Sequence, residues 1–525
     1  QGGSAAIAGQ MNIGQRPGGV SRLDISGGTF TQSGGTFYLG IASDTAMTVS
    51  GSAAVNVGTM NFGLQAGGPV ALNLAGGTLR TTGMTYGGSG YAGPATVRFD
   101  GGTLEAGASF STPTSGNFQF VVDGGGATFD TMGNSLTIPG SFGVGSGAGD
   151  LTKTGAGTLT LSGDYSGLRG DTIINQGTLV FARSLGQNAW HGGTITVNAG
   201  GVLDSPSHIP FGYPGNRSLL TDLFVNGGSV RYHPPSGSTL QFANLRMAGG
   251  TLDLLNSGGV FLPYGDVTVD AGTAAAIQST GGGAGALLLR NNSHHTVFDI
   301  GAGGSLDVSI PVWADGWGGG YTGLNKTGEG TLTLAGVSTY TGPTTVSAGT
   351  LLVDGTIVSP VSVVDGGTLG GTGVISAPVS VAPRGHVAPG DSAGTLSTGP
   401  LALAGGSFFD VEIDPGAWDS LLVAGEVDVT GAILNLMPLA SFSAFNGSRY
   451  LIVDNDGADD VVGRFDSLLE GALLEVGGSQ FAITYFGGTG NDIVLTSVPE
   501  PLTLGLWGLA LGGIGRYVRR RRRQR

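Results

Sequence analysis

"LTKTGAGTLTLSG" at Leu151–Gly163 and "LNKTGEGTLTLAG" at Leu324–Gly336 are two copies of one sequence, because they agree at 10 of 13 positions. Each copy is followed by a Tyr-Ser-Gly or Tyr-Thr-Gly word and then by a Gly-Thr-Leu run. Lys153 and Lys326 are the only lysines in the chain, and they occupy the same place in the two copies. The chain therefore contains an internal repeat, and its two lysines should occupy equivalent structural positions.

A shorter word, Gly-Gly-Thr followed by an apolar residue, recurs with variations along the whole chain. Adjacent words lie 25 residues apart at Gly76 and Gly101, and 27 and then 22 residues apart at Gly200, Gly227 and Gly249. The runs between them alternate in polarity and are rich in Thr, Val and Ile, which is typical of strands. Three strands of about five residues with three short turns make a coil of roughly 20 to 27 residues. We therefore predict an all-β fold, a right-handed parallel β-helix.

The alternative fold is an array of β-sandwiches, which would also show short strands separated by glycine. Sandwiches give no reason to repeat one word at the spacing of a coil. In a β-helix, Lys153 and Lys326 should lie at coil corners, and the TLTL runs that follow them should be parallel strands.

Composition excludes several classes of protein. The chain has 525 residues with 104 glycines but only 22 prolines and no Gly-X-Y period, so it is neither collagen nor a Pro/Gly-rich disordered chain. The absence of cysteine does not decide the redox compartment. Before Val498 the chain has 15 basic and 35 acidic residues. A body of that charge repels phosphate backbones, so we expect no nucleic-acid partner.

The two copies resemble autotransporter-associated β-strand repeats, which occur in exported bacterial passenger domains and surface proteins. The sequence from Tyr450, YLIVDNDGADD and onward, is similar to a C-terminal β module that precedes a sorting signal. The end of the chain resembles a PEP-CTERM signal. The expected divisions are degenerate coils at 1–150, a β-helix at 151–400 with repeats at 151–181 and 324–353, a β module at 401–497 and a sorting tail at 498–525.

The tail combines a Pro-Glu-Pro word, an apolar run of 14 residues at Leu502–Gly515 and a block of arginines. Such a run is shorter than the ~20 residues of a typical membrane-spanning helix, and the positive-inside rule keeps arginines on the cytoplasmic side. We expect a single C-terminal apolar helix that pauses in the inner membrane. The resemblance implies that an exosortase, a membrane protease-transpeptidase, recognises the word. The predicted site residues are Pro499, Glu500 and Pro501 in the sorting motif and Arg519, Arg520, Arg521, Arg522 and Arg523 in the membrane stop.

These features predict an exported structural or adhesin-like protein of the cell surface or extracellular matrix of a Gram-negative bacterium. The sequence begins at Gln1 without a Met or a signal peptide, so we expect that a signal was removed or that the sequence is truncated. Exopolysaccharide is a candidate partner. The alternative function is a β-helical protein that binds or degrades polysaccharide.

Two stretches resemble calcium-binding motifs. GGTGNDIVL, which contains Asp492, matches a calcium-binding nonapeptide, but it occurs once and such a site needs consecutive copies. DNDGADD, which begins at Asp454, resembles an EF-hand loop but has Phe465 at the position of the bidentate Glu. His294 and His295 would point to opposite faces of a regular strand. We therefore predict no metal site and no cofactor.

No group of catalytic residues stands out in the sequence. The carboxylates Asp253, Asp266, Asp270 and Asp299 are too scattered to form an acid–base pair. The aromatic residues Trp313, Trp317 and Tyr321 lie in a glycine-rich stretch that would either present rings to sugars or pack on the flank of the helix. We expect no enzymatic activity.

Overall fold

The computed structural model describes residues 3–65, 67–88, 90–183, 193–207, 221–233, 238–255, 260–282, 285–291, 294–314, 322–439, 447–456 and 459–498. The regular secondary structure in these ranges is all β-strand. None of the residues described forms a helix long and apolar enough to cross a membrane. The predicted C-terminal helix falls at 498–525, of which all but Val498 lies outside the described residues.

The chain divides into two compact units. Unit 1 comprises Gln1–Asp299 and Gly304–Tyr321, and unit 2 comprises Ile300–Gly303 and Thr322–Arg525. In both units successive strands pair in parallel with the equivalent strand of the next coil. The prediction of a parallel β-helix is confirmed, and its right-handed sense stays a prediction.

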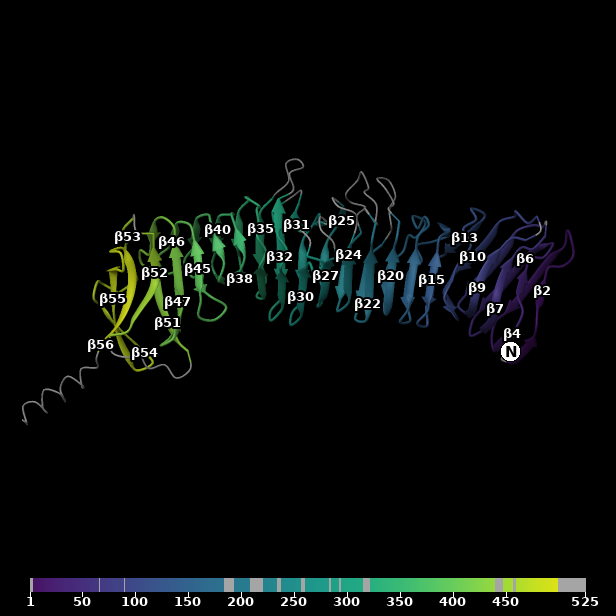
Figure 1. Ribbon diagram of the computed structural model, residues 1–525, viewed down its shortest axis with the longest axis horizontal. Coiled ribbons are helices and arrows are strands. Elements are labelled where there is room, and N and C mark those ends of the chain that lie inside the picture. Colours follow the sequence, from purple (N-terminus) through teal and green to yellow (C-terminus); the bar gives the residue numbers. More distant parts are fainter. Residues whose placement is uncertain are drawn as a thin grey trace, which may run out of the picture. The chain divides into compact units, whose positions relative to one another are not determined.

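The strands of unit 1 form four groups of parallel strands, and β15, β20, β22, β24 and β27 in Figure 1 show the stacking within one group. The first group is β1(Ser4–Ala8), β2(Met11–Ile13), β4(Thr29–Ser33), β5(Phe37–Leu39), β7(Ala54–Phe62), β9(Thr78–Tyr86), β11(Gly102–Ala106), β14(Ala127–Asp130), β17(Leu151–Thr154), β19(Thr172–Ile174), β21(Ile195–Asn198), β23(Leu223–Asn226), β26(Leu245–Met247), β29(Val267–Val269) and β32(Thr296–Ile300). The second is β3(Val20–Ile25), β6(Asp44–Ser50), β8(Val70–Ala75), β10(Ala95–Phe99), β13(Phe118–Val122) and β16(Ser141–Val144). The third is β12(Phe110–Ser111), β15(Ser135–Ile138), β18(Thr158–Leu161), β20(Gly177–Phe181), β22(Gly201–Ser205), β24(Ser229–Tyr232), β27(Gly250–Leu254), β30(Ala274–Gln278) and β33(Ser305–Val308). The fourth is β25(Thr239–Phe242), β28(Val260–Pro263), β31(Ala286–Leu289) and β34(Val312–Ala314).

Unit 2 contains three groups of strands. The first is β35(Leu324–Thr327), β37(Thr344–Val346), β40(Val361–Val363), β43(Val379–Val381), β46(Leu401–Leu403), β50(Val427–Asp428) and β53(Val461–Val462). The second is β36(Thr331–Leu334), β38(Gly349–Val353), β41(Gly367–Gly371), β44(His386–Pro389), β47(Phe408–Asp414), β48(Ala417–Trp418) and β51(Ile433–Pro438). The third is β39(Thr356–Ile357), β42(Val374–Ile375), β45(Thr395–Thr398), β49(Ser420–Val423), β52(Arg449–Asn455), β54(Leu473–Val476), β55(Ser479–Gly487) and β56(Asp492–Val498).

The core follows from the two-residue alternation of the strands. In β18 the residues Leu159 and Leu161 are fully buried, while the two threonines between and before them are only partly buried. Leu159 lies opposite Leu179 of β20 in the next coil, so each coil packs its apolar residues on those of its neighbour. Truncating one of these leucines to Ala should cost about 2–5 kcal/mol.

The end of unit 2 departs from regular coils. Strands β52, β54, β55 and β56 pair antiparallel, whereas β49 and β52 pair in parallel. A mixed sheet therefore closes the described part of the chain (Figure 1), as expected for the β module at its C-terminal end.

The repeated glycine of the Gly-Thr-Leu run has a steric cause. Gly177 has a φ of 70°, and a Cβ atom there would lie 2.4 Å from the carbonyl oxygens of Gly155 and Gly157 in the preceding coil. Gly349 has a φ of 61° and the same close approach in unit 2. The coils can stack at this corner only where no side chain is present.

Candidate functional site

Lys153 and Lys326 occupy equivalent positions, as the repeat predicts, but each lies within a strand next to a coil corner and not at the corner itself. Each is the third residue of a strand, β17 or β35, whose alternation turns the first and third side chains toward the interior. Both lysines are fully buried. The TLTL runs that follow are the parallel strands β18 and β36. The predicted equivalence of the two lysines and the parallel TLTL strands are confirmed. The structure adds that both ammonium groups lie in the interior of the helix.

Backbone carbonyl groups surround the Lys153 ammonium. Its Nζ donates to the carbonyl oxygens of Thr154 and Gly155, each 2.7 Å away in the turn that follows β17. It also reaches the carbonyl oxygen of Gln176 at 2.9 Å in the next coil and Oγ1 of Thr131 at 2.9 Å in the preceding one. One side chain thus joins three successive coils.

Lys326 repeats this arrangement in unit 2. Its Nζ donates to the carbonyl oxygens of Thr327 at 2.8 Å, Gly328 at 2.7 Å and Ala348 at 3.1 Å. The two equivalent positions therefore share the same kind of hydrogen bonds, from a buried ammonium group to backbone carbonyl groups. In each case the ammonium supplies hydrogen-bond donors to carbonyl groups in the interior of the helix.

The surroundings of Lys153 decide its chemistry. Burial lowers the pKa of Lys153 to about 8, and the nearby Asp130 carboxylate opposes that shift. The side chain therefore remains protonated at neutral pH, and carbonyl groups accept its protons. With no solvent contact and no free lone pair, it is a structural cation and not a nucleophile or base.

The tyrosines of the two Tyr-x-Gly words are also buried. The Tyr165 hydroxyl donates to the carbonyl oxygen of Arg183, and the Tyr340 hydroxyl is 2.8 Å from Oγ1 of Thr344. Burial raises the pKa of Tyr340 to about 12. The tyrosine of each Tyr-x-Gly word thus supplies a buried hydroxyl group that bonds the main chain or a neighbouring hydroxyl.

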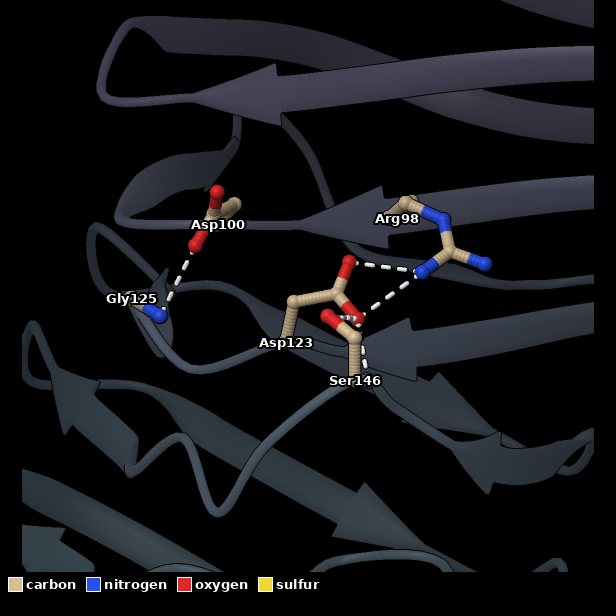
Figure 2. A network of polar contacts seen from close by, with 5 residues as sticks. All are labelled: Arg98, Asp100, Asp123, Gly125 and Ser146. Carbon is tan, nitrogen blue, oxygen red and sulfur yellow. Dashed lines mark hydrogen bonds and ion pairs between the residues drawn. The ribbon is translucent and has the colours of Figure 1, made fainter.

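A second polar network joins coils near the start of unit 1 (Figure 2). Arg98 Nη1 lies 2.8 and 2.6 Å from the two carboxylate oxygens of Asp123. The amide and hydroxyl of Ser146 donate to Asp123 Oδ1 at 2.6 and 2.8 Å. Asp100 is separate from this group and accepts only the Gly125 amide, at 2.8 Å. Burial opposes ionisation of Asp123, but the Ser146 and Arg98 hydrogen bonds outweigh it and hold its pKa below the usual value.

Ion pairs elsewhere also connect neighbouring coils. Their partners are 19 to 29 residues apart, the length of a coil. Because these pairs are spaced regularly along the coils, they stabilise the stacking of neighbouring coils and do not cluster into one site. They are Arg98–Asp123, His233–Asp204, Arg246–Asp270, His294–Asp266, Arg384–Asp365 and His386–Asp410.

A row of Asp and Asn side chains lies at one corner of unit 1. Asp150 Oδ1 accepts the amide of Asp171, and Asp171 Oδ1 accepts the amide of the next equivalent residue, Thr194, at 2.9 and 2.7 Å. Asp222 and Asn244 continue the pattern, since Asp222 Oδ1 accepts the Asn244 amide and Asn244 Oδ1 that of Asp266. These acids hold the register of the coils.

The sorting motif and membrane stop are not placed by the structure. Pro499, Glu500 and Pro501 lie outside the described residues, as do Arg519, Arg520, Arg521, Arg522 and Arg523. Their predicted roles stay predictions from the sequence.

The two calcium-like motifs meet in the mixed sheet. Asp492 is buried, and its Oδ1 and Oδ2 accept the amides of Asn455 and Thr489, each at 2.9 Å. The side-chain amides of Asn455 and Asn491 both donate to the carbonyl oxygen of Asp459 at 2.7 Å. The motif is thus a hydrogen-bonded turn. Among the described residues no group of three or more His, Cys, Asp or Glu is positioned to hold a metal ion.

The carboxylates considered for catalysis have separate partners. Asp270 pairs with Arg246, and Asp253 accepts the amide and hydroxyl of Thr280 at 2.9 and 2.7 Å. Asp266 Oδ1 accepts the Val297 amide at 3.0 Å. Asp299 is an exposed residue of β32. The structure places Asp253 in a different group of strands from the others, so it does not assemble them into one pair.

Asp419 is a buried carboxyl group that sequence reasoning missed. Burial raises the pKa of Asp419 to about 6, although hydrogen bonds from the Glu412 and Gly394 amides oppose the shift. Those amides lie 2.7 and 2.9 Å from its two oxygens. Because both oxygens bond the main chain, Asp419 orders the β47–β49 region and does not face a substrate.

The aromatic stretch is only partly described. Trp313 lies on β34 with a partly buried side chain, and Trp317 and Tyr321 lie outside the described residues. His294 Nδ1 donates to the carbonyl oxygen of His295 at 2.7 Å, and its Nε2 lies 3.6 Å from Asp266 Oδ2. Neither group forms a binding site among the residues described.

Residues 151–181 and 324–353 match the family described as Passenger-associated-transport-repeat. They are passenger-associated transport repeats. The matched ranges are those predicted from the two sequence copies, and each contains one buried lysine. Both matched ranges contain the glycine, lysine and tyrosine positions described above.

Two curated proteins are similar to parts of the chain that contains the transport repeats. One is the "Adhesin BmaC autotransporter" of Brucella suis biovar 1 (strain 1330), 32% identical over 288 residues, which are 45% of this chain and 8% of that protein. The other is the "Extracellular serine protease" of Serratia marcescens, 37% identical over 172 residues, which are 31% of this chain and 16% of that protein. The chain therefore matches a small part of each of these relatives.

Among solved structures, the crystal structure of the Haemophilus influenzae Hap adhesin aligns with 94% of this chain and 64% of its own chain. The sequence identity is 13% and the TM-score is 0.27.

Proposed function

We propose that this chain is an exported, cell-surface or matrix-associated adhesin-like β-helix without enzymatic activity. The supporting observation is the pair of passenger-associated transport repeats inside a parallel β-helix, with a relative named as an adhesin autotransporter. Polar side chains at the surface join one coil to the next, as in the row that contains Asp150 and Asp171. Such side chains suit many weak contacts spread over successive coils rather than one catalytic pocket.

The location of the protein tests this proposal. Intact cells that express the chain should lose it when treated with an external protease, whereas a periplasmic protein should survive until the outer membrane is opened. Cells should also gain adherence to a surface coated with their own exopolysaccharide. Protection from protease in intact cells would contradict the proposed location.

We further propose that the Pro-Glu-Pro word at Pro499–Pro501 and the arginine block are a sorting signal read by an exosortase. The support is the order of the three sequence features in the tail. In this scheme the precursor pauses in the inner membrane and the body is then passed to the envelope. Exopolysaccharide is the partner we propose for the mature surface.

A hydrolase is the second candidate, because one relative is named as an extracellular serine protease and His386 Nδ1 lies 2.6 Å from Asp410 Oδ2. The His386 ring is stacked on Phe408, with the ring centroids 4.5 Å apart, and Asp410 Oδ1 also accepts from Asn435. We assign this group to stacking of coils. Labelling of the purified chain by a fluorophosphonate, abolished by His386→Ala, would favour the hydrolase instead.

A further inference from the structure

The last hairpin of unit 2 exposes an unusual number of large apolar side chains. Strands β54 and β55 pair antiparallel, with Leu473 opposite Ala482. In β55 the residues Phe481, Ile483 and Tyr485 are buried, so the alternate residues face outward. This outward side of β54 and β55, with the turn before β54, is called the hairpin face below.

Three side chains dominate the hairpin face. Leu469 is 68% exposed, Leu473 is 60% exposed and Phe486 is 63% exposed. Leu473 lies opposite Ala482, and Phe486 follows Ala482 by four residues along β55, so both side chains lie on the outward side. Leu469 lies in the turn before β54, where its carbonyl oxygen accepts the Ala472 amide at 2.8 Å. An apolar patch of this kind on a soluble module marks a binding surface.

Hydrogen bonds fix the turn that contains Leu469 against β55. The Gly471 amide donates to the carbonyl oxygen of Ile483 at 2.9 Å, which continues the pairing beyond β54. Glu470 Oε2 accepts the Tyr485 amide at 2.9 Å. The turn before β54 is therefore bonded to β55 at Ile483 and Tyr485.

Charge restricts what can cover the hairpin face. The segment from Arg449 to Val498 has eight acidic residues against two arginines. A second copy would bring the same excess of negative charge, and an anionic lipid surface would also be repelled. The favoured occupant has apolar side chains flanked by positive charge.

We propose that the hairpin face binds residues Leu502–Arg525 of the same chain. That segment has an apolar run at Leu502–Gly515 and seven arginines with no acidic residue. It begins four residues after Val498, the end of β56, and Val498 pairs with Gln480 of β55. A chain advances at most ~3.6 Å per residue, so the segment starts within about 15 Å of the sheet.

Docking keeps the apolar run out of water before the segment meets a membrane, and the acidic residues around the face attract the arginines. The face then becomes free once the segment is inserted or removed. This binding does not depend on sorting by an exosortase, so either proposal can fail without the other.

Disulfide trapping in the full chain tests the proposal. The native chain has no cysteine, so only the introduced thiols can form a disulfide. Thr484→Cys places a thiol on the hairpin face, and Leu509→Cys places its partner in the apolar run. The matched control combines Leu509→Cys with Ser397→Cys, an outward position on β45 of the same unit. Intrachain disulfide should form about tenfold faster with Thr484→Cys, because docking raises the effective concentration of the thiols.

Two further variants sharpen the result. Leu469→Asp with Phe486→Asp should reduce the rate to that of the control, and both positions are too exposed for the change to unfold the sheet. Raising salt to 1 M, where the Debye length is about 3 Å, should also slow trapping. Equal rates for the two cysteine pairs would overturn the proposal. Disulfides formed only between chains would overturn it as well and show that the face joins two copies.

Discussion

At the scale of single residues, the repeats depend on a charge in an apolar interior. Lysine is rarely buried, and an ammonium without partners would be expelled from the core. At Lys153 the cost is offset by carbonyl groups of a turn and of the next coil, which need donors of their own. The inward position is visible in the sequence, since Leu-x-Lys alternates like Leu-x-Leu, but the carbonyl acceptors appear only when coils stack.

Replacing Lys153 by Met should destabilise the corner next to it. Methionine retains much of the length and volume but donates no hydrogen bond, so buried carbonyl groups lose their partner. We expect a loss of about 1–3 kcal/mol in the free energy of local opening, measured by hydrogen exchange of the amides in β17–β19. Thr152→Met, an outward change on the same strand, is the control. Equal protection in both variants would show that the carbonyl groups find other donors.

The Asp123 network should respond to pH in a defined direction. Its folded pKa is depressed, so its contribution is present above the unfolded pKa of about 3.9 and is lost as pH falls through the folded pKa. Asp123→Ala should therefore reduce the protection of β13 and β16 at pH 7 by about 1–3 kcal/mol. The difference from the native chain should shrink as the medium is acidified below the unfolded pKa.

Asp100→Ala is the control for this measurement, because Asp100 lies in the same region and accepts a single amide. Its effect at pH 7 should be smaller. An Asp123→Ala effect that is independent of pH would show that packing, and not the ionised carboxylate, carries the contribution.

At the scale of strands and turns, the repeated words predict most of the fold. Gly-Thr-Leu and TLTL mark strands because apolar and β-branched residues alternate, and glycine marks corners where coils approach closely. The repeated words did not predict the mixed sheet or the hairpin face. Leu473 and Phe486 are 13 residues apart, and the antiparallel pairing of β54 with β55 places both on the outward side. The His386–Asp410 contact likewise depends on non-local register.

Two glycines of unit 2 allow the effect of a steric contact to be measured separately from the effect of backbone strain. Gly349 and Gly366 have φ values of 61° and 82°, but only at Gly349 would a Cβ atom meet neighbouring atoms, 2.4 Å from the Gly328 oxygen. Gly366→Ala should cost about 1–2 kcal/mol for the left-handed backbone alone. Gly349→Ala should destabilise the chain more than Gly366→Ala does, and it should therefore give the lower thermal melting temperature. Equal melting temperatures would show that the coils can separate at this corner without loss.

At the scale of the whole chain, the match to passenger-associated transport repeats covers two short segments of the β-helix. The matched repeats contain the lysine, tyrosine and glycine positions that join one coil to the next. Similarity of this kind reflects how a β-helix is built. What the protein binds must then depend on outward residues and on segments outside the coils, and the repeats do not predict these parts.

The stability of the chain should be independent of calcium. Asp492 and the turn that begins at Asp454 are held by main-chain and side-chain amides, without a gathered set of ligands. Thermal melting in EDTA should match melting in millimolar calcium. A melting temperature that rises with added calcium, and falls back in Asp492→Asn, would show that the two motifs form a site.

The fate of the tail tests the proposed sorting route. Seven arginines cross a bilayer at high cost, and a 14-residue apolar run is barely long enough to remain in one. The full chain should therefore be an inner-membrane precursor, and the mature surface form should lack Arg519–Arg525. Glu500→Ala should trap the precursor, because the recognition word is lost while the membrane stop persists. A chain ending at Thr496 should instead be released as a periplasmic body. Peptide mapping of the surface fraction by mass spectrometry decides between the routes, since mature protein that retains the arginine block would make the tail a permanent anchor.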